Sequence, residues 1–164
     1  MTWGRDTDEH EAREQLAMFQ DVGGNLVDTA DVYADGAAEK ILGRLLAEDH
    51  RRDGIVLATK SVSRPGTERR FDASRRHLLA ALDGSLRRLG VDCIDLWQLH
   101  AWDPWTPIDE TLSAVDSAIA AGKVRYAGVS NYSGWQVAQA ATLQSNGSNS
   151  NPLASVQVEY SLVQ

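Results

Sequence analysis

The stretch Asn25-Leu26-Val27-Asp28-Thr29-Ala30-Asp31-Val32-Tyr33 decides how the rest of the chain is interpreted. In it a short apolar strand ends in the carboxylate of Asp28, and the phenol of Tyr33 follows five residues later. An ordinary strand and turn has the same composition, because Asp often caps turns and Tyr is often half-buried. Later apolar strands also end in side chains able to do chemistry, namely Lys60, His100 and the pair Ser130–Asn131. This recurrence favours a functional interpretation over a purely structural one.

Length and composition predict one soluble globular domain. The chain has 164 residues, a net charge of −7 and one cysteine. The acidic balance argues against nucleic acids and anionic membranes as partners and favours small molecules. A single cysteine excludes an internal disulfide framework and a paired-cysteine metal motif. With no apolar run near the roughly 20 residues of a membrane span and no leader pattern at the amino terminus, we expect a cytoplasmic protein.

Helix and strand patterns alternate along the whole chain. Helical spacing of apolar residues predicts a helix over residues 8–22, a second that contains Ile41 to Leu46, and a third from Asp72 as N-cap to Gly90. A fourth helix should begin with Thr106 as cap and Pro107 as its first residue. The strands are predicted at residues 26–28, 55–60, 94–100, 124–129 and 156–160.

Short strands alternating with helices imply βαβ units and a parallel sheet. An open dinucleotide-binding sheet should carry a Gly-x-Gly-x-x-Gly fingerprint after its first strand, and no strand end here has one. A (β/α)8 barrel of the TIM-barrel type instead places functional groups on several strand ends at one face. The sequence therefore predicts an α/β protein with barrel architecture.

Five pieces of the sequence, in order and spacing, resemble the aldo-keto reductase family. They are DTADVY at residues 28–33, ATK at 58–60, LWQLH at 96–100, GVSN at 128–131 and QVEY at 157–160. The resemblance extends over practically the whole chain but covers only about half of the family's barrel. It implies that residues 1–164 are an aldo-keto reductase domain of about six β/α units. Only residues 1–4 correspond to the first strand, and the last two units are absent.

The residues themselves suit carbonyl reduction. A phenol with an ordinary pKa near 10 is a reluctant acid unless a cation lies beside it, and Lys60 can supply that cation. A desolvated ammonium needs a counter-ion, which Asp28 can provide from another strand. By resemblance, Tyr33 is the general acid, Lys60 and Asp28 set its pKa, and His100 orients the substrate oxygen. Also by resemblance, Ser130, Asn131 and Gln157 hydrogen-bond the nicotinamide carboxamide of NADPH.

Two tryptophans after His100, Trp102 and Trp105, are candidates for the wall of a substrate pocket. A flat apolar wall there suits an aromatic or extended carbonyl compound, although packing beneath the loop is an equal alternative. In the family, the groups that hold the adenosine 2′-phosphate lie beyond Gln164, so the preference for NADPH comes from the resemblance alone. We expect the 164 residues by themselves to be an inactive fragment.

Two other functions stay open at this stage. Some proteins of this fold bind the cofactor chiefly for regulation, which would make the chain part of an NADPH-binding regulatory module without significant turnover. A barrel strand can also present a lysine that forms a Schiff base with a ketone, so Lys60 could belong to a lyase. Slow turnover despite tight cofactor binding distinguishes the first alternative, and trapping of an adduct on Lys60 distinguishes the second.

Overall fold

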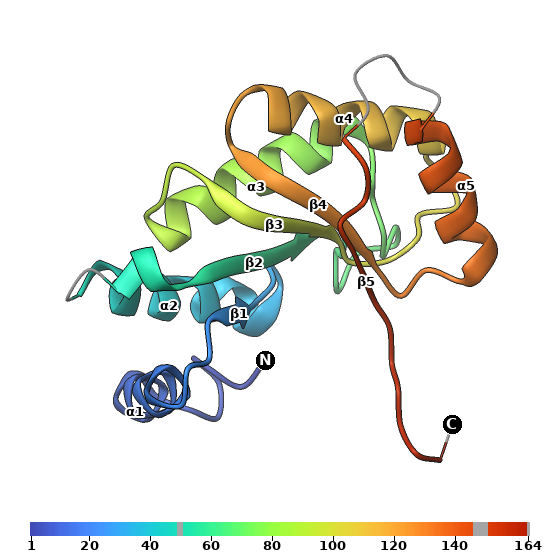
Figure 1. Ribbon diagram of the computed structural model, residues 1–164. Coiled ribbons are helices and arrows are strands. Elements are labelled where there is room, and N and C mark those ends of the chain that lie inside the picture. The colour runs from blue at the N-terminus through green and yellow to red at the C-terminus, as the bar shows by residue number, and fades with distance from the viewer. Residues whose placement is uncertain (49–50, 146–150, 164) are drawn as a thin grey trace.

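The structure, a computed structural model, describes residues 1–48, 51–145 and 151–163 (Figure 1). In chain order its elements are α1 (Glu9–Asp21), β1 (Leu26–Asp28), η1 (Tyr33–Gly36), α2 (Ala37–Ala47), η2 (Arg51–Gly54), β2 (Val56–Ser61), α3 (Arg75–Leu89), β3 (Ile94–Leu99), α4 (Ile108–Ala120), β4 (Val124–Ser130), α5 (Gly134–Ser145) and β5 (Ser155–Gln157). Within the described part of the chain, no helix combines the length and the apolar character needed to cross a membrane.

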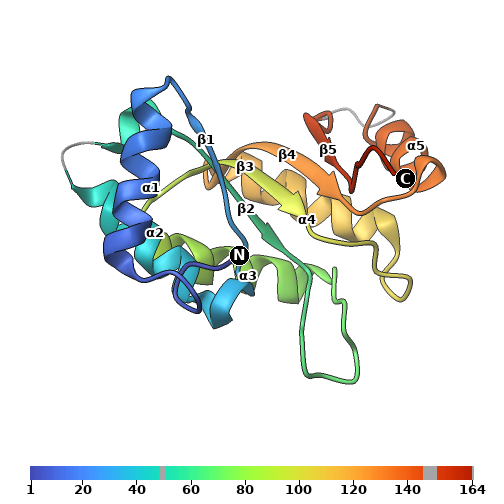
Figure 2. The same ribbon diagram turned by 90° about the horizontal axis from the view of Figure 1, so that it is seen from below.

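The strands of the described residues form one five-stranded sheet in the order β1-β2-β3-β4-β5, and every neighbouring pair is parallel. The sheet twists and curls along its length, while α2, α3, α4 and α5 lie together along one side of it (Figures 1 and 2). Each strand after β1 pairs with the one before it in the chain, which is the usual arrangement of consecutive β-helix-β units. The result is a curled half-barrel, which agrees in part with the predicted barrel.

The hydrophobic core lies between the sheet and its helices. Alternate strand residues such as Leu57, Trp97, Leu99 and Val129 are almost fully buried. The helices contribute apolar side chains to it, and the core includes Leu42, Leu45, Leu78, Leu82, Ala114 and Val115. Burial of these side chains drives folding and fixes which face of each strand points toward the helices.

The opposite face of the sheet carries exposed apolar groups at its amino-terminal end. Leu26 is 53% exposed, Val56 is 41% exposed and Tyr126 is 62% exposed. Leu26 pairs with Val56 in the register, so their side chains lie on the same face. Because successive residues alternate between faces, this is the face that also carries Asp28 and Lys60. The inner face is therefore apolar where the strands begin and polar where they end.

Three predicted boundaries are wrong in detail. Helix α3 is capped by Ser74, whose hydroxyl accepts from the His77 N–H, because the carboxylate of Asp72 accepts instead from the Ser74 N–H and from Arg64. Helix α4 has Pro107 at its N-cap position. Thr106 does not cap it, because its hydroxyl donates to Asp103.

Strand β5 is also shorter than the predicted 156–160 and pairs only at Ser155–Gln157. Its partner β4 ends at Ser130, which is opposite Gln157, so residues farther along have no ladder to join on that side.

Replacing Leu82 with alanine tests the packing between α3 and the sheet. Leu82 is fully buried, so Leu82→Ala should lower the free energy of unfolding by about 2–5 kcal/mol through lost burial and the cavity left behind. Leu143, which is 41% exposed on α5, is the control, and Leu143→Ala should change it by about 0.5 kcal/mol or less. Urea unfolding followed by circular dichroism measures both, and equal effects would contradict the assigned core.

Candidate active site

The polar ends of three strands meet at the carboxyl edge of the sheet. Asp28 is the last residue of β1, Lys60 the penultimate residue of β2, and His100 follows the last residue of β3. In the parallel register Asp28 lies beside Ala58, and Lys60 lies beside Gln98. Since all strands run in the same direction, the side chains at their ends come together at one edge of the sheet.

Lys60 is the central charged group of this edge. The residue is 1% exposed, and its ammonium forms an ion pair with the partly exposed carboxylate of Asp28. The same ammonium donates to the backbone carbonyl of Thr29 at 3.0 Å and to the hydroxyl of Tyr33 at 3.4 Å. A buried ammonium is unfavourable without such partners, so all of its donors are directed at oxygen atoms. Lys60 thus links the carboxylate to the phenol.

Tyr33 sits at the start of a strained turn. Ala34 has a φ of 49° and Asp35 a φ of 53°, and Gly36 continues the left-handed conformation with a φ of 83°. For residues other than glycine this region costs of the order of 1–3 kcal/mol each, so surrounding contacts must hold the turn. One of them is the hydrogen bond from the Asp31 N–H to the carbonyl of Lys60, at 3.0 Å. The turn that carries the phenol is therefore tied to the strand that carries the ammonium.

His100 completes the group around the phenol. Its ring packs edge to face against Tyr33, with 5.8 Å between ring centroids. Burial lowers the pKa of His100, the nearby positive charge of Lys60 lowers it further, and Asp28 opposes them in part. We therefore expect a neutral imidazole at pH 7, which can donate one N–H to an oxygen placed beside Tyr33.

Sequence reasoning missed two side chains of this edge, Gln98 and Ser155. The amide of Gln98 donates to one oxygen of Asp28 at 3.3 Å, and its own oxygen accepts from the Ser155 hydroxyl at 3.1 Å. Gln157 donates to the other oxygen of Asp28 at 3.3 Å. Gln98 lies two residues before His100, and Ser155 two before Gln157, so the two-residue period of a strand could have placed them on the same face.

Ser130 and Asn131 lie where β4 ends. Ser130 is 3% exposed, and Asn131 adopts a left-handed conformation with a φ of 57°. The Asn131 amide donates to the His100 carbonyl at 2.9 Å and to the Ser130 hydroxyl oxygen at 3.1 Å, and its N–H donates to the Gln157 carbonyl at 2.9 Å. These contacts bring the three predicted cofactor-binding residues to one place beside His100. That they hold a nicotinamide stays a prediction.

The two candidate pocket tryptophans have different surroundings. Trp102 packs against the core, and its ring lies edge to face with Tyr132 at 5.2 Å and Trp135 at 5.5 Å between centroids. Trp105 is 78% exposed and lines a cavity of about 610 Å³ together with Arg64 and Arg69. The ring of Trp102 is therefore held in place by its neighbours, whereas the exposed ring of Trp105 is accessible to a ligand.

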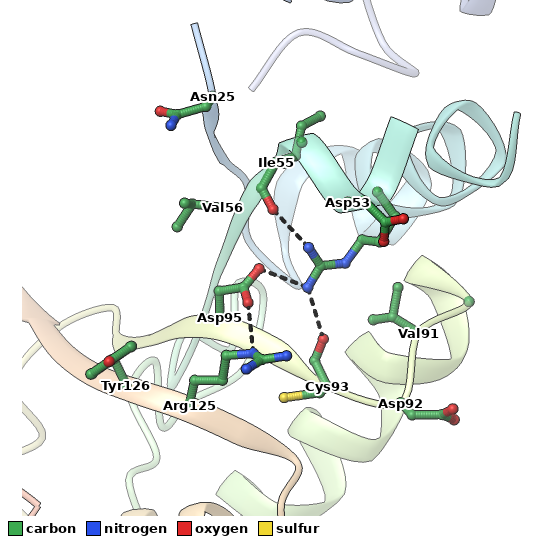
Figure 3. A pocket seen from close by; sticks show the side chains of 13 residues that line it. Asn25, Asp53, Ile55, Val56, Val91, Asp92, Cys93, Asp95, Arg125 and Tyr126 are labelled. Atoms are coloured by element: carbon green, nitrogen blue, oxygen red, sulfur yellow. Dashed lines mark hydrogen bonds and ion pairs between the residues drawn. The ribbon is translucent and has the colours of Figure 1, made fainter. Parts of the chain in front are cut away.

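A cavity of about 710 Å³ lies at the amino-terminal ends of the strands, opposite the ends that carry Lys60 and His100 (Figure 3). Its wall holds Asp95, which pairs with Arg52 at 2.6 Å and Arg125 at 3.0 Å and accepts the Leu57 N–H at 2.9 Å. The two arginines share this one carboxylate, which offsets only part of their positive charge. Because barrel proteins use the carboxyl ends of their strands for chemistry, we assign this cavity to structure and place the candidate site at Lys60.

The carboxyl group of Asp31 lies behind the Tyr33 turn. Burial and the nearby carboxylate of Glu39 raise its pKa to about 7, although Arg88, the Val32 N–H and the Ser61 hydroxyl all act to lower it. Its Oδ1 is buried and has no hydrogen-bond partner among the described residues. Asp31 is thus a buried acid that holds its proton well above the pH at which an exposed aspartate loses it.

Comparison with known proteins gives a consistent family. The model of the aldo/keto reductase family matches residues 1–164. The aldo-keto reductase YhdN of Bacillus subtilis is 39% identical over 132 residues, which are 80% of this chain and 40% of that protein. The aldo-keto reductase yakc [NADP(+)] of Schizosaccharomyces pombe is 38% identical over 149 residues, 89% of this chain and 42% of that protein.

A third relative has a different kind of name. A probable voltage-gated potassium channel subunit beta of Oryza sativa is 34% identical over 163 residues, 99% of this chain and 49% of that protein. The chain therefore spans less than half the length of each of these three relatives.

Replacing Asp31 with asparagine should change how stability depends on pH. An acid whose pKa rises from 3.8 unfolded to about 7 folded destabilises the folded state progressively as pH rises between these values. The free energy of unfolding of Asp31→Asn, relative to the unmodified protein, should therefore increase by roughly 4 kcal/mol at most between pH 4 and pH 8. Urea unfolding across this range measures it, with Asp35→Asn, an exposed carboxylate of the same turn, as control. Parallel curves for Asp31→Asn and the unmodified protein would contradict the assignment.

Proposed function

Because this chain belongs to the aldo/keto reductase family, we propose that it carries the catalytic groups of an oxidoreductase that reduces an aldehyde or ketone with NADPH. One observation carries this proposal: the buried ammonium of Lys60 contacts both the carboxylate of Asp28 and the hydroxyl of Tyr33. An ammonium held in this way stabilises the negative charge that the phenol oxygen acquires when it gives up its proton. Tyr33 is then the proton donor to the carbonyl oxygen.

Each neighbouring side chain has a part in this proton transfer. Asp28 keeps the ammonium paired and is itself oriented by the amides of Gln98 and Gln157. The neutral imidazole of His100 donates to the carbonyl oxygen and holds it next to the Tyr33 hydroxyl. When bound, NADPH supplies the hydride, so all that the protein must provide at the oxygen is one proton.

Ser130, Asn131 and Gln157 fit the carboxamide of a nicotinamide. They offer a hydroxyl and two amides, which together can donate to a carbonyl and accept from an NH2 group. Gln157 is exposed, and its 3.3 Å contact with Asp28 is long enough to be exchanged for a ligand. We place the substrate between these groups and Trp102, with Trp105 as a second apolar contact.

We further propose that the reaction takes place in a longer protein of about twice this length, as in the relatives. Residues 1–164 would then supply about the first six β/α units of a (β/α)8 barrel, without most of the first strand. The apolar inner face at Leu26, Val56 and Tyr126 would be covered by the barrel interior. The single cysteine fits a reducing compartment, so we place the protein in the cytoplasm.

A regulatory role is the second candidate. The match to the rice channel subunit beta covers almost the whole chain, so the same scaffold occurs in a protein with that name. In this case cofactor would bind tightly while carbonyl reduction stayed very slow. A Schiff-base role for Lys60 is less well supported, because a nucleophilic amine must be neutral and this one is paired with a carboxylate.

Replacing Tyr33 with phenylalanine tests the proton donor in the longer protein. Tyr33→Phe keeps the ring packing against His100 but removes the transferable proton, so turnover should fall by about 10²-fold or more with little change in cofactor affinity. Tyr126→Phe, which alters a phenol near the start of β4 and away from Lys60, is the control. Steady-state reduction of an aromatic aldehyde measures both. Undiminished turnover in Tyr33→Phe would exclude this phenol as the acid.

Residues 1–164 expressed alone should not catalyse reduction. The open edges of β1 and β5 and the uncovered inner face favour association, and a domain's whole stability is only about 5–15 kcal/mol. Light scattering should therefore report assemblies larger than a monomer, and titration with NADPH should give no saturable change in its fluorescence. The longer protein, measured in parallel, provides the positive control. A monomer that binds NADPH at micromolar concentration and reduces an aromatic aldehyde would contradict this expectation.

A further inference from the structure

A polar cluster, partly or fully buried at each of its residues, lies on the helix side of the sheet, behind the Tyr33 turn. It consists of Glu39 from α2, Arg88 from α3, Thr59 from β2 and Asp31 from the turn itself. Glu39 is fully buried, and none of these groups is used by the proton transfer proposed above. A charged cluster of this kind is costly to bury, so its retention calls for a physical reason.

Arg88 packs against the Tyr33 turn from the helix side of the sheet. A Cβ atom placed on Gly36 would lie 2.9 Å from Arg88 Cδ, 3.0 Å from Arg88 Nε and 3.6 Å from the backbone oxygen of Asp31. The arginine side chain therefore packs against the left-handed part of the turn, where only glycine leaves room for it. Any sideways movement of Arg88 would remove the support under the residues that follow Tyr33.

Glu39 fixes Arg88 in this place. One oxygen of its carboxylate accepts from Arg88 Nε at 2.7 Å, and the other accepts from the Thr59 hydroxyl at 2.6 Å. A second guanidinium nitrogen of Arg88 donates to the Ser85 hydroxyl at 3.2 Å. Thr59 precedes Lys60 on β2, and alternate strand residues face opposite sides. Glu39 is thus bonded to the strand position next to the ammonium, from behind the sheet.

These contacts form a continuous connection from the ammonium to the phenol. From β2, the Thr59 hydroxyl bonds Glu39, Glu39 bonds Arg88, and Arg88 packs against the turn. The turn is bonded back to β2 by the hydrogen bond from the Asp31 N–H to the Lys60 carbonyl. We propose that Glu39 and Arg88 are positioning residues, which hold the strained turn so that the Tyr33 hydroxyl stays beside Lys60 and His100. This inference rests on the proposed role of Tyr33, and it assigns a function to groups that touch no reactant.

Replacing Glu39 with glutamine, in the longer protein, tests the inference. Glu39→Gln keeps the size and the bond to Thr59 but removes the charge that holds Arg88. Misplacement of a reacting group by about 1 Å can cost about 10²-fold in rate, so kcat should fall by about 10- to 100-fold while the KM for the aldehyde changes less than threefold. In the NMR spectrum, the nuclear Overhauser effects between the Tyr33 and His100 ring protons should weaken, because those rings pack edge to face at 5.8 Å.

Asp95→Asn is the matched control. Asp95 is a carboxylate held by two arginines on the same sheet, but at the opposite end of the strands. This variant should lower the unfolding midpoint and leave both kcat and the ring contacts unchanged. If Glu39→Gln does not fold, Arg88→Lys replaces it, because lysine keeps the charge but lacks the planar guanidinium whose separate nitrogens bond Glu39 and Ser85.

The outcomes separate the two proposals. Weakened ring contacts and a lower kcat in Glu39→Gln or Arg88→Lys, but not in Asp95→Asn, support the positioning role. Unchanged ring contacts in the cluster variants, or equal weakening in Asp95→Asn, overturn it. If the unmodified protein shows no reduction at all, the proposed function fails, while the ring contacts still report whether the cluster holds Tyr33 in place.

Discussion

The burial of one ammonium group organises the carboxyl edge of this protein. Lys60 is almost inaccessible to water, and a cation in that position is tolerable only with oxygen atoms around it. The ion pair with Asp28 joins β2 to β1, and the bond to the Thr29 carbonyl joins it to the backbone beyond β1. The phenol of Tyr33 comes to the same nitrogen through a turn that the backbone adopts only under constraint. Burial of the Lys60 ammonium thus requires oxygen atoms from Asp28, Thr29 and Tyr33 around it. Because the turn after Tyr33 is strained, its conformation requires support from neighbouring contacts.

The two faces of the sheet make different polar contacts at the end of β2. On β2, Lys60 faces the open side and Thr59 faces the helices, and each is bonded to a carboxylate on its own side. The face that carries Lys60 can therefore remain open to a ligand while the packed face supplies rigidity. Glu39, Arg88 and Asp31 belong to the packed face, and they bring polar contacts into what would otherwise be a purely apolar layer.

Much of the architecture was predictable from the sequence, and the exceptions have physical causes. Apolar periodicity placed the helices and strands, because burial against one sheet face dictates the spacing. The N-caps of α3 and α4 were misplaced because Asp72 and Thr106 have competing hydrogen-bond partners elsewhere in the fold. Strand ends and family motifs indicated Asp28, Tyr33, Lys60 and His100, which the fold brings together. Glu39 and Arg88 were not foreseen, since pairing between side chains of different elements leaves no mark in local spacing. Gln98 was missed although the two-residue period of β3 places it on the same face as His100.

The order of the strands bears on how the chain can fold during its synthesis. Each strand in the described residues lies beside the one made just before it, so no strand has to wait for a partner far ahead in the sequence. Paired strand residues such as Leu26 and Val56 are 30 positions apart, so each pairing closes a loop of moderate length, and the entropy cost of closure grows only slowly with that length. A ribosome could release this sheet one strand at a time, with each helix covering its strand as it emerges. Until later segments arrive, the growing edge would offer a template for wrong partners, and a chaperone would be useful at that stage.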